Sequence, residues 1–332
     1  MKAPQNRNRR YASRPVFMGW AGAIALSLAS GATNAAEPSG PRSTVRDHLW
    51  IFTTPSGSSN NYMEMGGFRG GSRMTPAEGA FFLNIPNLIL VRNRELPSLP
   101  SSQEWRAKTE YEQYAIAFRP LNKVIWSVVG SGGKGGMSEL HHVLGLAKKY
   151  PNIGGIFLDD YIVEPRKQPD GRTVGRPAIM PEDLKSARER MKTVGRPMET
   201  WVTLYTHELD PKHPRHKGCE PPLAGFLNLF DVLTLWTWNG EELRDLDASL
   251  ATLEAMAPKT ARKALGLYMW DYFNKRPMPI ELMKLQCERG LKWLRDGRVE
   301  YLIFLSSTLC DMGLPSVEFA RQWIAEVRGE PL

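Results

Sequence analysis

Residues 153–162 read Ile-Gly-Gly-Ile-Phe-Leu-Asp-Asp-Tyr-Ile, an apolar run that is interrupted by two adjacent carboxylates. Such a short, nearly continuous apolar run is typical of a strand buried on both faces, as in a parallel sheet. Polar side chains directly after the run lie at the C-terminal end of the strand, where barrels of alternating strands and helices place their active sites. The stretch therefore predicts both a buried strand and a candidate site.

Seven other short runs have the same character. They are residues 48–54 (HLWIFTT), 87–93 (NLILVRN), 123–130 (KVIWSVVG), 199–209 (ETWVTLYTHEL), 231–239 (DVLTLWTWN), 263–273 (KALGLYMWDYF) and 299–308 (VEYLIFLSST). Helical periodicity lies between the runs, at residues 102–121, 138–150, 181–194, 241–256, 279–295 and 315–327. Eight repeated units over about 260 residues predict one α/β domain, a (β/α)8 TIM barrel.

The main alternative in the same class is a doubly wound open sheet. Such a sheet usually carries a glycine-rich phosphate turn after its first strand, but here residues 54–61 read TPSGSSNN. The glycine cluster lies at residues 130–136 instead, and it lacks the spacing of a phosphate-binding loop. We interpret the cluster as a mobile loop after the third strand, with an anion-binding cradle as the alternative.

The first 36 residues are organised like a secretory signal. Five basic residues and no acid occupy positions 1–15, an apolar run follows at 16–29, and small residues at 33 and 35 or 36 suit a cleavage site. We therefore predict a signal peptide over 1–36 and the barrel over 37–332. The mature protein would be secreted or periplasmic, without a membrane span. An uncleaved N-terminal anchor is the alternative.

The charge and the cysteine content limit which molecules and metal ions the protein is expected to bind. The whole chain has a net charge of +8, which falls to +3 without the five basic residues of the signal. This removes the argument for a nucleic-acid partner. Cys219, Cys287 and Cys310 are widely spaced, so they allow at most one disulfide and no C-x-x-C metal site. We predict neither a metal nor a cofactor, and we expect a monomer.

Carboxylates follow three of the predicted strands: Asp159 and Asp160, Glu208, and Asp271. Two carboxyl groups across a pocket suit glycoside hydrolysis, because one protonates the leaving oxygen while the other attacks the sugar or activates water. Since side chains alternate along a strand, Asp159 and Asp160 should point to opposite sides, and we favour Asp159 facing the pocket.

Two of these acids have a plain structural alternative. Asp271 could cap the end of its strand or pair with Lys275 or Arg276, and Glu208 could be oriented by His207 or simply be solvated.

Aromatic and polar side chains at the same strand ends are candidate substrate contacts. They are Tyr161, Tyr205, His207, Trp236, Trp238, Asn239, Tyr268, Trp270 and Arg92. Trp236 and Trp238 share one face of their strand, which fits either core packing or a platform for a sugar ring. Arg92 and Arg94 fit either an acidic sugar or ion pairs with Glu95 and Asp159, and we favour the ion pairs.

The segment from Gly154 to Tyr161 (GGIFLDDY) resembles the fourth-strand segment D-G-I-x-x-D-D-Y of glycoside-hydrolase-like (β/α)8 barrels, with Gly154 in place of the first Asp. The resemblance implies that the Asp pair lies at the catalytic centre of a hydrolase that acts on carbohydrate.

The leading hypothesis is thus a secreted glycoside hydrolase that cleaves a poly- or oligosaccharide. A non-catalytic carbohydrate-binding barrel of the cell envelope is the first alternative. The second is a metal-dependent hydrolase that uses Asp159, Asp160, His207 and Glu208.

Overall fold

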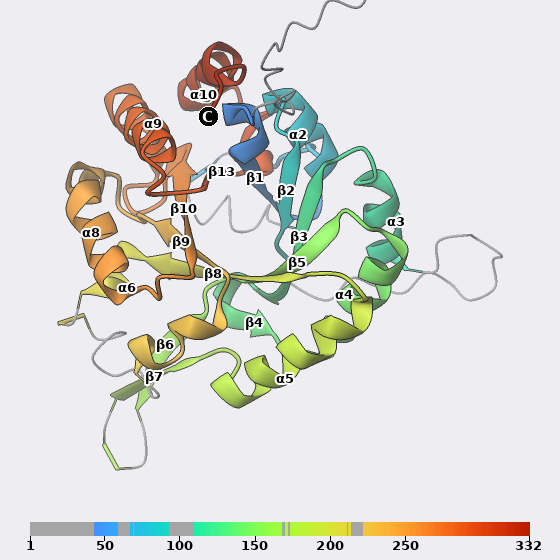
Figure 1. Cartoon of the computed structure of the whole chain (residues 1–332). Coiled ribbons are helices and arrows are strands. Elements are labelled where there is room, and N and C mark those ends of the chain that lie inside the picture. Colours follow the sequence, from blue (N-terminus) through green and yellow to red (C-terminus); the bar gives the residue numbers. More distant parts are fainter. Residues whose placement is uncertain are drawn as a thin grey trace, which may run out of the picture. The chain divides into compact units, whose positions relative to one another are not determined.

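The protein is described here by a computed structural model that covers residues 43–58, 67–68, 70–92, 109–167, 170–171, 173–210, 212–213 and 222–332 (Figure 1). These residues all belong to one compact unit, Arg42–Leu332. The predicted signal peptide at 1–36 lies outside them, so it stays a prediction.

Eight parallel strands form a closed barrel, as predicted (Figure 1). They are β1 (Leu49–Thr53), β2 (Asn87–Leu90), β3 (Lys123–Gly130), β5 (Ile153–Leu158), β8 (Glu199–Tyr205), β9 (Val232–Trp236), β10 (Arg262–Tyr268) and β13 (Tyr301–Leu305). Each strand pairs with its neighbours in chain order, and pairing of β1 with β13 closes the ring. The eight strands coincide with the eight apolar runs, although most of the strands end earlier than the runs do.

Helices cover the outside of the barrel (Figure 1). They are α2 (Pro76–Leu83), α3 (Glu110–Ala117), α4 (Met137–Lys149), α5 (Pro181–Met191), α8 (Leu246–Met256), α9 (Ile280–Arg295) and α10 (Pro315–Val327). Five of them match the predicted segments. Helix α3 is shorter than the predicted segment 102–121, of which residues 102–108 lie outside the described part. The sequence analysis missed α2, although Thr75 and Glu78 form a capping box at its start.

Short elements follow several strands at the C-terminal end of the barrel. They are the 3-10 turn η2 (Ser131–Gly133), the two-residue strand β4 (Lys134–Gly135), the hairpin β6 (Ile162–Lys167) with β7 (Thr173–Pro177), the turn α6 (Thr206–Leu209), η6 (Gly240–Asp245), and the pair β11 (Trp270–Asp271) with β12 (Arg276–Pro277). The runs predicted as long strands at 199–209 and 263–273 therefore each end in a separate local element. Among the described residues, no helix combines the length and apolar character needed to cross a membrane.

Aromatic side chains that point inward fill the barrel in layers. The rings of Trp50, Trp201 and Tyr301 lie in contact, with centroids 4.7 Å apart between Trp50 and Trp201 and 5.0 Å apart between Trp201 and Tyr301. One layer further along the strands, Phe52 contacts both Phe157 and Trp236. Such large residues fit because the interior of a barrel is a packed core rather than a pore.

Glycine makes room for the indole of Trp236. A Cβ atom at Gly266 on β10 would lie only 2.0 Å from Cε3 of Trp236. Trp236 is almost fully buried and donates from Nε1 to Oγ1 of Thr234 at 2.7 Å. The sequence leaves open whether Trp236 packs in the core or forms a platform for a sugar ring, and the structure places it in the core.

We expect Gly266→Ala to lower the free energy of unfolding by about 1–3 kcal/mol, because the indole cannot move away within a filled barrel. Urea denaturation measures the change. Gly145→Ala in α4 is the matched control, since a Cβ there meets nothing within 4 Å; it should stabilise the helix by roughly 0.5–1 kcal/mol. Equal effects of the two substitutions would contradict this account of the core.

Candidate functional site

Asp159 and Asp160 lie in a turn directly after β5, where the alternation of the strand has ended. Asp160 adopts a left-handed backbone conformation, with φ of +43°. Its side chain therefore does not follow the up-and-down pattern that we expected for the pair. Both carboxyl groups accept hydrogen bonds from inward-facing side chains of the neighbouring strand β8, Thr203 and Tyr205. The two groups therefore lie together at the C-terminal end of the barrel.

The carboxyl group of Asp159 is buried and lies among hydroxyl groups. Its side chain is only 5% exposed. Thr203 donates from Oγ1 to Oδ1 at 3.1 Å, and Ser131 donates from Oγ to Oδ2 at 3.4 Å. Burial raises the pKa of Asp159 well above its ordinary value, and the neighbouring Asp160 carboxylate raises it further. Asp159 therefore holds its proton at a higher pH than an exposed aspartate does.

Asp160 is half-buried and accepts hydrogen bonds through both carboxyl oxygens. The hydroxyl of Tyr205 donates to Oδ1 at 2.7 Å, and the backbone amide of Gly132 donates to Oδ2 at 2.6 Å. Gly132 has φ of +73°, a conformation that favours glycine. The glycine cluster after β3 is thus a turn that binds the carboxylate of Asp160, and its predicted mobility stays a prediction.

An aromatic wall adjoins the two acids. Trp238 stacks on Tyr272 with ring centroids 5.3 Å apart and meets Tyr205 and Tyr268 edge-on. Burial raises the pKa of Tyr205 and of Tyr268, and the charges of Asp160 and Asp159 add to both shifts. The two hydroxyl groups therefore stay protonated close to the carboxyl pair, while Trp238 is 40% exposed.

The sequence analysis missed several members of this site: Ser131, Gly132, Thr203 and Tyr272. A signal existed for Thr203, which lies two residues before Tyr205 and so on the same face of its strand. The contacts of Ser131 and Gly132 with the Asp pair depend on how β3 and β5 align, which the sequence does not state.

Asp271 lies in a separate network. Its fully buried carboxylate accepts hydrogen bonds from the backbone amides of Gly240 and Asn274, and from the side chains of Asn274 and Arg276. Asn239 accepts from the amide of Glu241 and the side chain of Asn274 in the same region. These contacts hold the loops after β9 and β10, and they include the ion pair with Arg276 that we gave as one alternative. The catalytic role of Asp271 stays a prediction.

Glu208 and His207 support Tyr205. Glu208 is 1% exposed, and its Oε2 accepts a hydrogen bond from the backbone amide of Tyr205 at 3.0 Å. The ring of His207 stacks on Tyr205 at 5.3 Å and contacts His213. Glu208 thus serves to cap the turn α6, and His207 packs behind the tyrosine that binds Asp160.

Two further aromatic candidates, Tyr161 and Trp270, are buried. Tyr161 is fully buried, donates to the carbonyl of Ile179 at 2.7 Å, and packs against Phe226 and Phe230. Trp270 is 5% exposed and stacks on Phe68. The structure therefore places neither ring in the exposed aromatic wall.

Arg92 forms a buried ion pair, but with a partner that we did not predict. Its guanidinium contacts the Glu139 carboxylate of α4 and the hydroxyl of Tyr111, and Tyr111 itself donates to Glu139 at 2.6 Å. Glu95 lies outside the described residues, and Asp159 takes its hydrogen bonds from hydroxyl groups. Long-range packing of α4 on the barrel selects Glu139, which no sequence spacing indicates.

The described residues contain no group of three or more His, Cys, Asp and Glu side chains that could hold a metal ion. Of the four donors that we named for a metal-dependent hydrolase, Glu208 caps α6 and His207 stacks on Tyr205. Cys287 and Cys310 are buried free thiols.

No protein-family model matches the sequence, and no curated protein matches it significantly. Several solved structures are similar in fold. A protein assigned as an alpha-L-fucosidase from Bacteroides thetaiotaomicron VPI-5482 has a TM-score of 0.52 at 11% identity, over 90% of this chain and 100% of its own. This likeness supports the (β/α)8 barrel and, at such low identity, the fold alone.

Two further structures score below 0.5. A plant class V chitinase mutant from Cycas revoluta in complex with (GlcNAc)3 has a TM-score of 0.46 at 13% identity, over 83% of this chain and 99% of its own. A xylanase-alpha-amylase inhibitor protein in complex with trehalose has a TM-score of 0.47 at 11% identity, over 84% and 98%.

We expect Asp159→Asn to stabilise the protein at pH 8 and to leave its stability nearly unchanged at pH 4. The pKa of Asp159 is raised on folding, so its favourable contribution is present below the pKa of the unfolded chain and is lost as the pH rises through the folded pKa. Urea denaturation at both pH values measures this difference.

Asp231→Asn is the matched control, and its effect should have the opposite sign. Burial disfavours the charge of Asp231, but hydrogen bonds from Arg188 and Thr200 outweigh burial and lower its pKa. Its contribution is present above the unfolded pKa and is lost in acid, so this variant should be destabilised at pH 8. Destabilisation of Asp159→Asn at pH 8 would contradict the assignment of a strained, buried acid.

Proposed function

We propose that the protein is a glycoside hydrolase whose reaction takes place at Asp159 and Asp160. The observation that carries the proposal is a pair of adjacent carboxyl groups in unlike environments at the C-terminal end of a (β/α)8 barrel. One is buried among hydroxyl groups with a raised pKa, and the other is half-buried and hydrogen bonded through both oxygens. Pairs of acids whose environments separate their protonation states are suited to acid–base catalysis.

In this proposal Asp159 is the acid. Its raised pKa keeps it protonated in the pH range in which an exposed aspartate has lost its proton. It passes that proton to the glycosidic oxygen as the bond to the anomeric carbon breaks. Thr203 and Ser131 then stabilise the carboxylate that forms, through the hydrogen bonds that they already donate.

Asp160 acts as the carboxylate of the pair. It either attacks the anomeric carbon or takes the proton of the attacking water, and the anomeric configuration of the product distinguishes these two routes. Tyr205 and Gly132 hold its oxygens in place through hydrogen bonds of 2.7 and 2.6 Å. The exposed indole of Trp238 offers a flat apolar surface for a sugar ring next to the pair.

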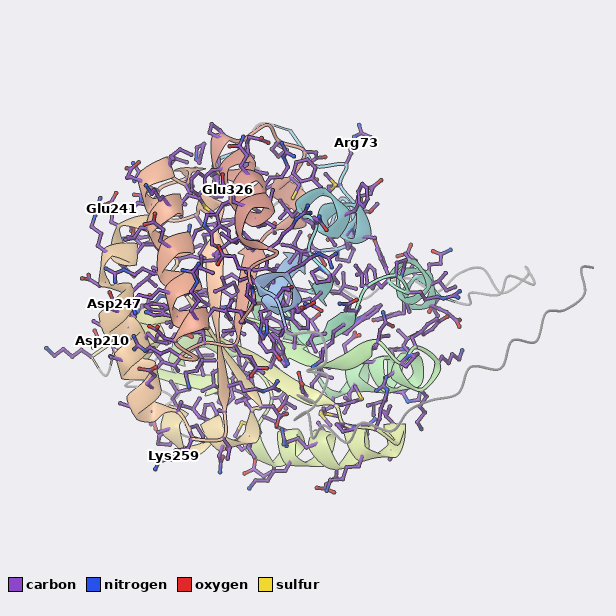
Figure 2. All side chains as sticks on the ribbon, turned by 45° about the horizontal axis from the view of Figure 1, so that its top comes forward. Arg73, Asp210, Glu241, Asp247, Lys259 and Glu326 are labelled. Carbon is purple, nitrogen blue, oxygen red and sulfur yellow. The ribbon has the colours of Figure 1, made fainter. Side chains whose placement is uncertain are left out.

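Asp159→Asn and Asp160→Asn should each lower the release of reducing sugar from a cleaved polysaccharide by about 10²–10⁴-fold, the usual contribution of an acid or base. A panel of polysaccharides with purified protein identifies the substrate. The control is Asp247→Asn, an exposed ion-pair partner of Arg289 on the outer side of the barrel (Figure 2), which should leave turnover unchanged.

Aryl glycosides with an acidic leaving group separate the two roles. Such a leaving group departs without protonation, so Asp159→Asn should lose much less activity on it than on the polysaccharide, whereas Asp160→Asn should lose activity on both. If both variants keep carbohydrate affinity and the parent shows no turnover on any substrate, the protein is a non-catalytic binding barrel.

The pH profile tests the acid independently. The hydrogen bond from Thr203 lowers the pKa of Asp159, so Thr203→Val should raise this pKa and move the alkaline limb of kcat/KM to higher pH. Asp160→Asn removes a charge that raises the same pKa, so the limb of its residual activity should move to lower pH. Thr252→Val, at a hydroxyl exposed on α8, is the control. An unchanged limb in both site variants would exclude Asp159 as the acid.

A further inference from the structure

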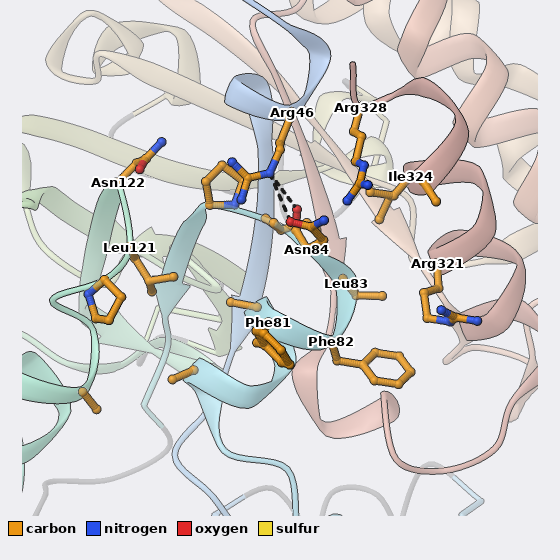
Figure 3. A pocket seen from close by; sticks show the side chains of 17 residues that line it. Arg46, Phe81, Phe82, Leu83, Asn84, Leu121, Asn122, Arg321, Ile324 and Arg328 are labelled. Atoms are coloured by element: carbon orange, nitrogen blue, oxygen red, sulfur yellow. Dashed lines mark hydrogen bonds between the residues drawn. The ribbon is translucent and has the colours of Figure 1, made fainter. Parts of the chain in front are cut away.

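A cavity lies at the other end of the barrel from Asp159 and Asp160, near the N-terminal ends of the strands (Figure 3). It has a volume of about 700 Å³ and lies between α2, the segment that joins α3 to β3, and α10. Its size is within the range of 300–1,000 Å³ that is typical of small-molecule sites. The residues that line it include none of the residues around Asp159 and Asp160.

Aromatic and aliphatic side chains form one side of this cavity. Phe81 and Phe82 on α2 are 87% and 36% exposed, although Leu83 of the same helix is buried. Leu121 and the buried Ile324 of α10 extend the apolar lining. A surface helix normally presents polar residues to water, so two adjacent exposed phenylalanines beside a hollow indicate a surface that receives an apolar group.

Three arginines also line the cavity, and none of its lining residues is Asp or Glu. Arg46 donates from Nε to Oδ1 and to the backbone carbonyl of Asn84, both at 3.2 Å. Arg321 is paired with Glu318, which lies outside the lining. Arg328 makes no side-chain hydrogen bond or ion pair within the part of the chain that the structure describes. Figure 3 shows Arg328 and Arg321 on the right of the hollow, Arg46 at its top, and Phe81 and Phe82 below them.

We propose that this cavity binds an anionic amphiphile, an acidic head group on an aliphatic chain. The carboxylate would pair with Arg328 and Arg46, and the chain would cover Phe81 and Phe82. Guanidinium groups bind carboxylates through charge-assisted hydrogen bonds. The lining thus offers groups for both parts of such a molecule, guanidinium groups for the acid and phenylalanine rings for the chain.

The charges also disfavour a second copy of this chain as the occupant. In a two-fold symmetric dimer the same patch lies on both subunits. Such an interface would bring the three arginines of each copy into one buried surface that has no acid in its lining, and gathering like charges in this way is costly.

The probes are dodecanoate, 1-dodecanol and acetate, which separate the head from the tail. Calorimetry with the parent protein, below the micelle-forming concentration, should show saturable binding of dodecanoate and much weaker binding of the other two. Arg328→Gln should weaken the affinity for dodecanoate about tenfold, because it removes a charged hydrogen bond. Arg328→Lys should keep most of the affinity, and Phe81→Ala should weaken it severalfold.

Arg289→Gln and Phe273→Ala are the matched controls, since both residues are exposed outside this cavity; neither should change the affinity. Equal affinity for dodecanol and dodecanoate, or an unchanged affinity in Arg328→Gln, would overturn the proposal. So would a concentration-dependent dimer that Phe81→Ala abolishes, because a second copy would then cover the cavity. None of these outcomes depends on the reaction proposed for Asp159 and Asp160.

Discussion

Closure of the parallel sheet is the constraint on which the rest of this structure depends. Once β1 pairs with β13, every second side chain of all eight strands must enter one shared interior. Tryptophan, tyrosine and phenylalanine side chains fill the layers of that interior described above, and Gly266 leaves the space that Trp236 occupies. The same inward direction carries Thr203 and Tyr205 to the Asp pair at the C-terminal end. The inward-facing residues of the strands therefore form the core along the barrel and part of the site at its C-terminal end.

The site places a carboxyl group where its charge is disfavoured. Asp159 is buried in the barrel and lies beside another acid, and hydrogen bonds from Thr203, Ser131 and the backbone of Asp160 offset this only in part. Two other buried acids are paired with cations, Glu139 with Arg92 and Asp271 with Arg276. Perturbed acids of this kind cluster at functional sites, because the strain that they cause is retained only where chemistry requires it.

The two ends of the barrel carry different chemistry. Short turns after the strands surround the Asp pair at one end. The cavity that arginine and phenylalanine side chains line lies near the other end. The packing of α2 on the barrel does not require its exposed phenylalanines, since the buried face of that helix packs through Ala80 and Leu83. The charged and apolar walls there are consequently best understood as a recognition surface of their own.

The sequence by itself determined the barrel, because eight apolar runs separated by helical periodicity allow few other arrangements, and it placed Asp159 and Asp160 at a strand end. It did not determine which neighbours those acids would meet. The left-handed turn at Asp160 overrides the alternation of the strand, and the register between β3, β5 and β8 selects Ser131, Gly132 and Thr203 as partners. The same limitation applies to Arg92, whose partners Tyr111 and Glu139 lie on helices far away in the chain. It applies to Asp271 only for its contact with Gly240, because Asn274 and Arg276 are close in sequence. Spacing along a strand reveals which residues share a face, whereas contacts between strands depend on a register that only tertiary packing decides.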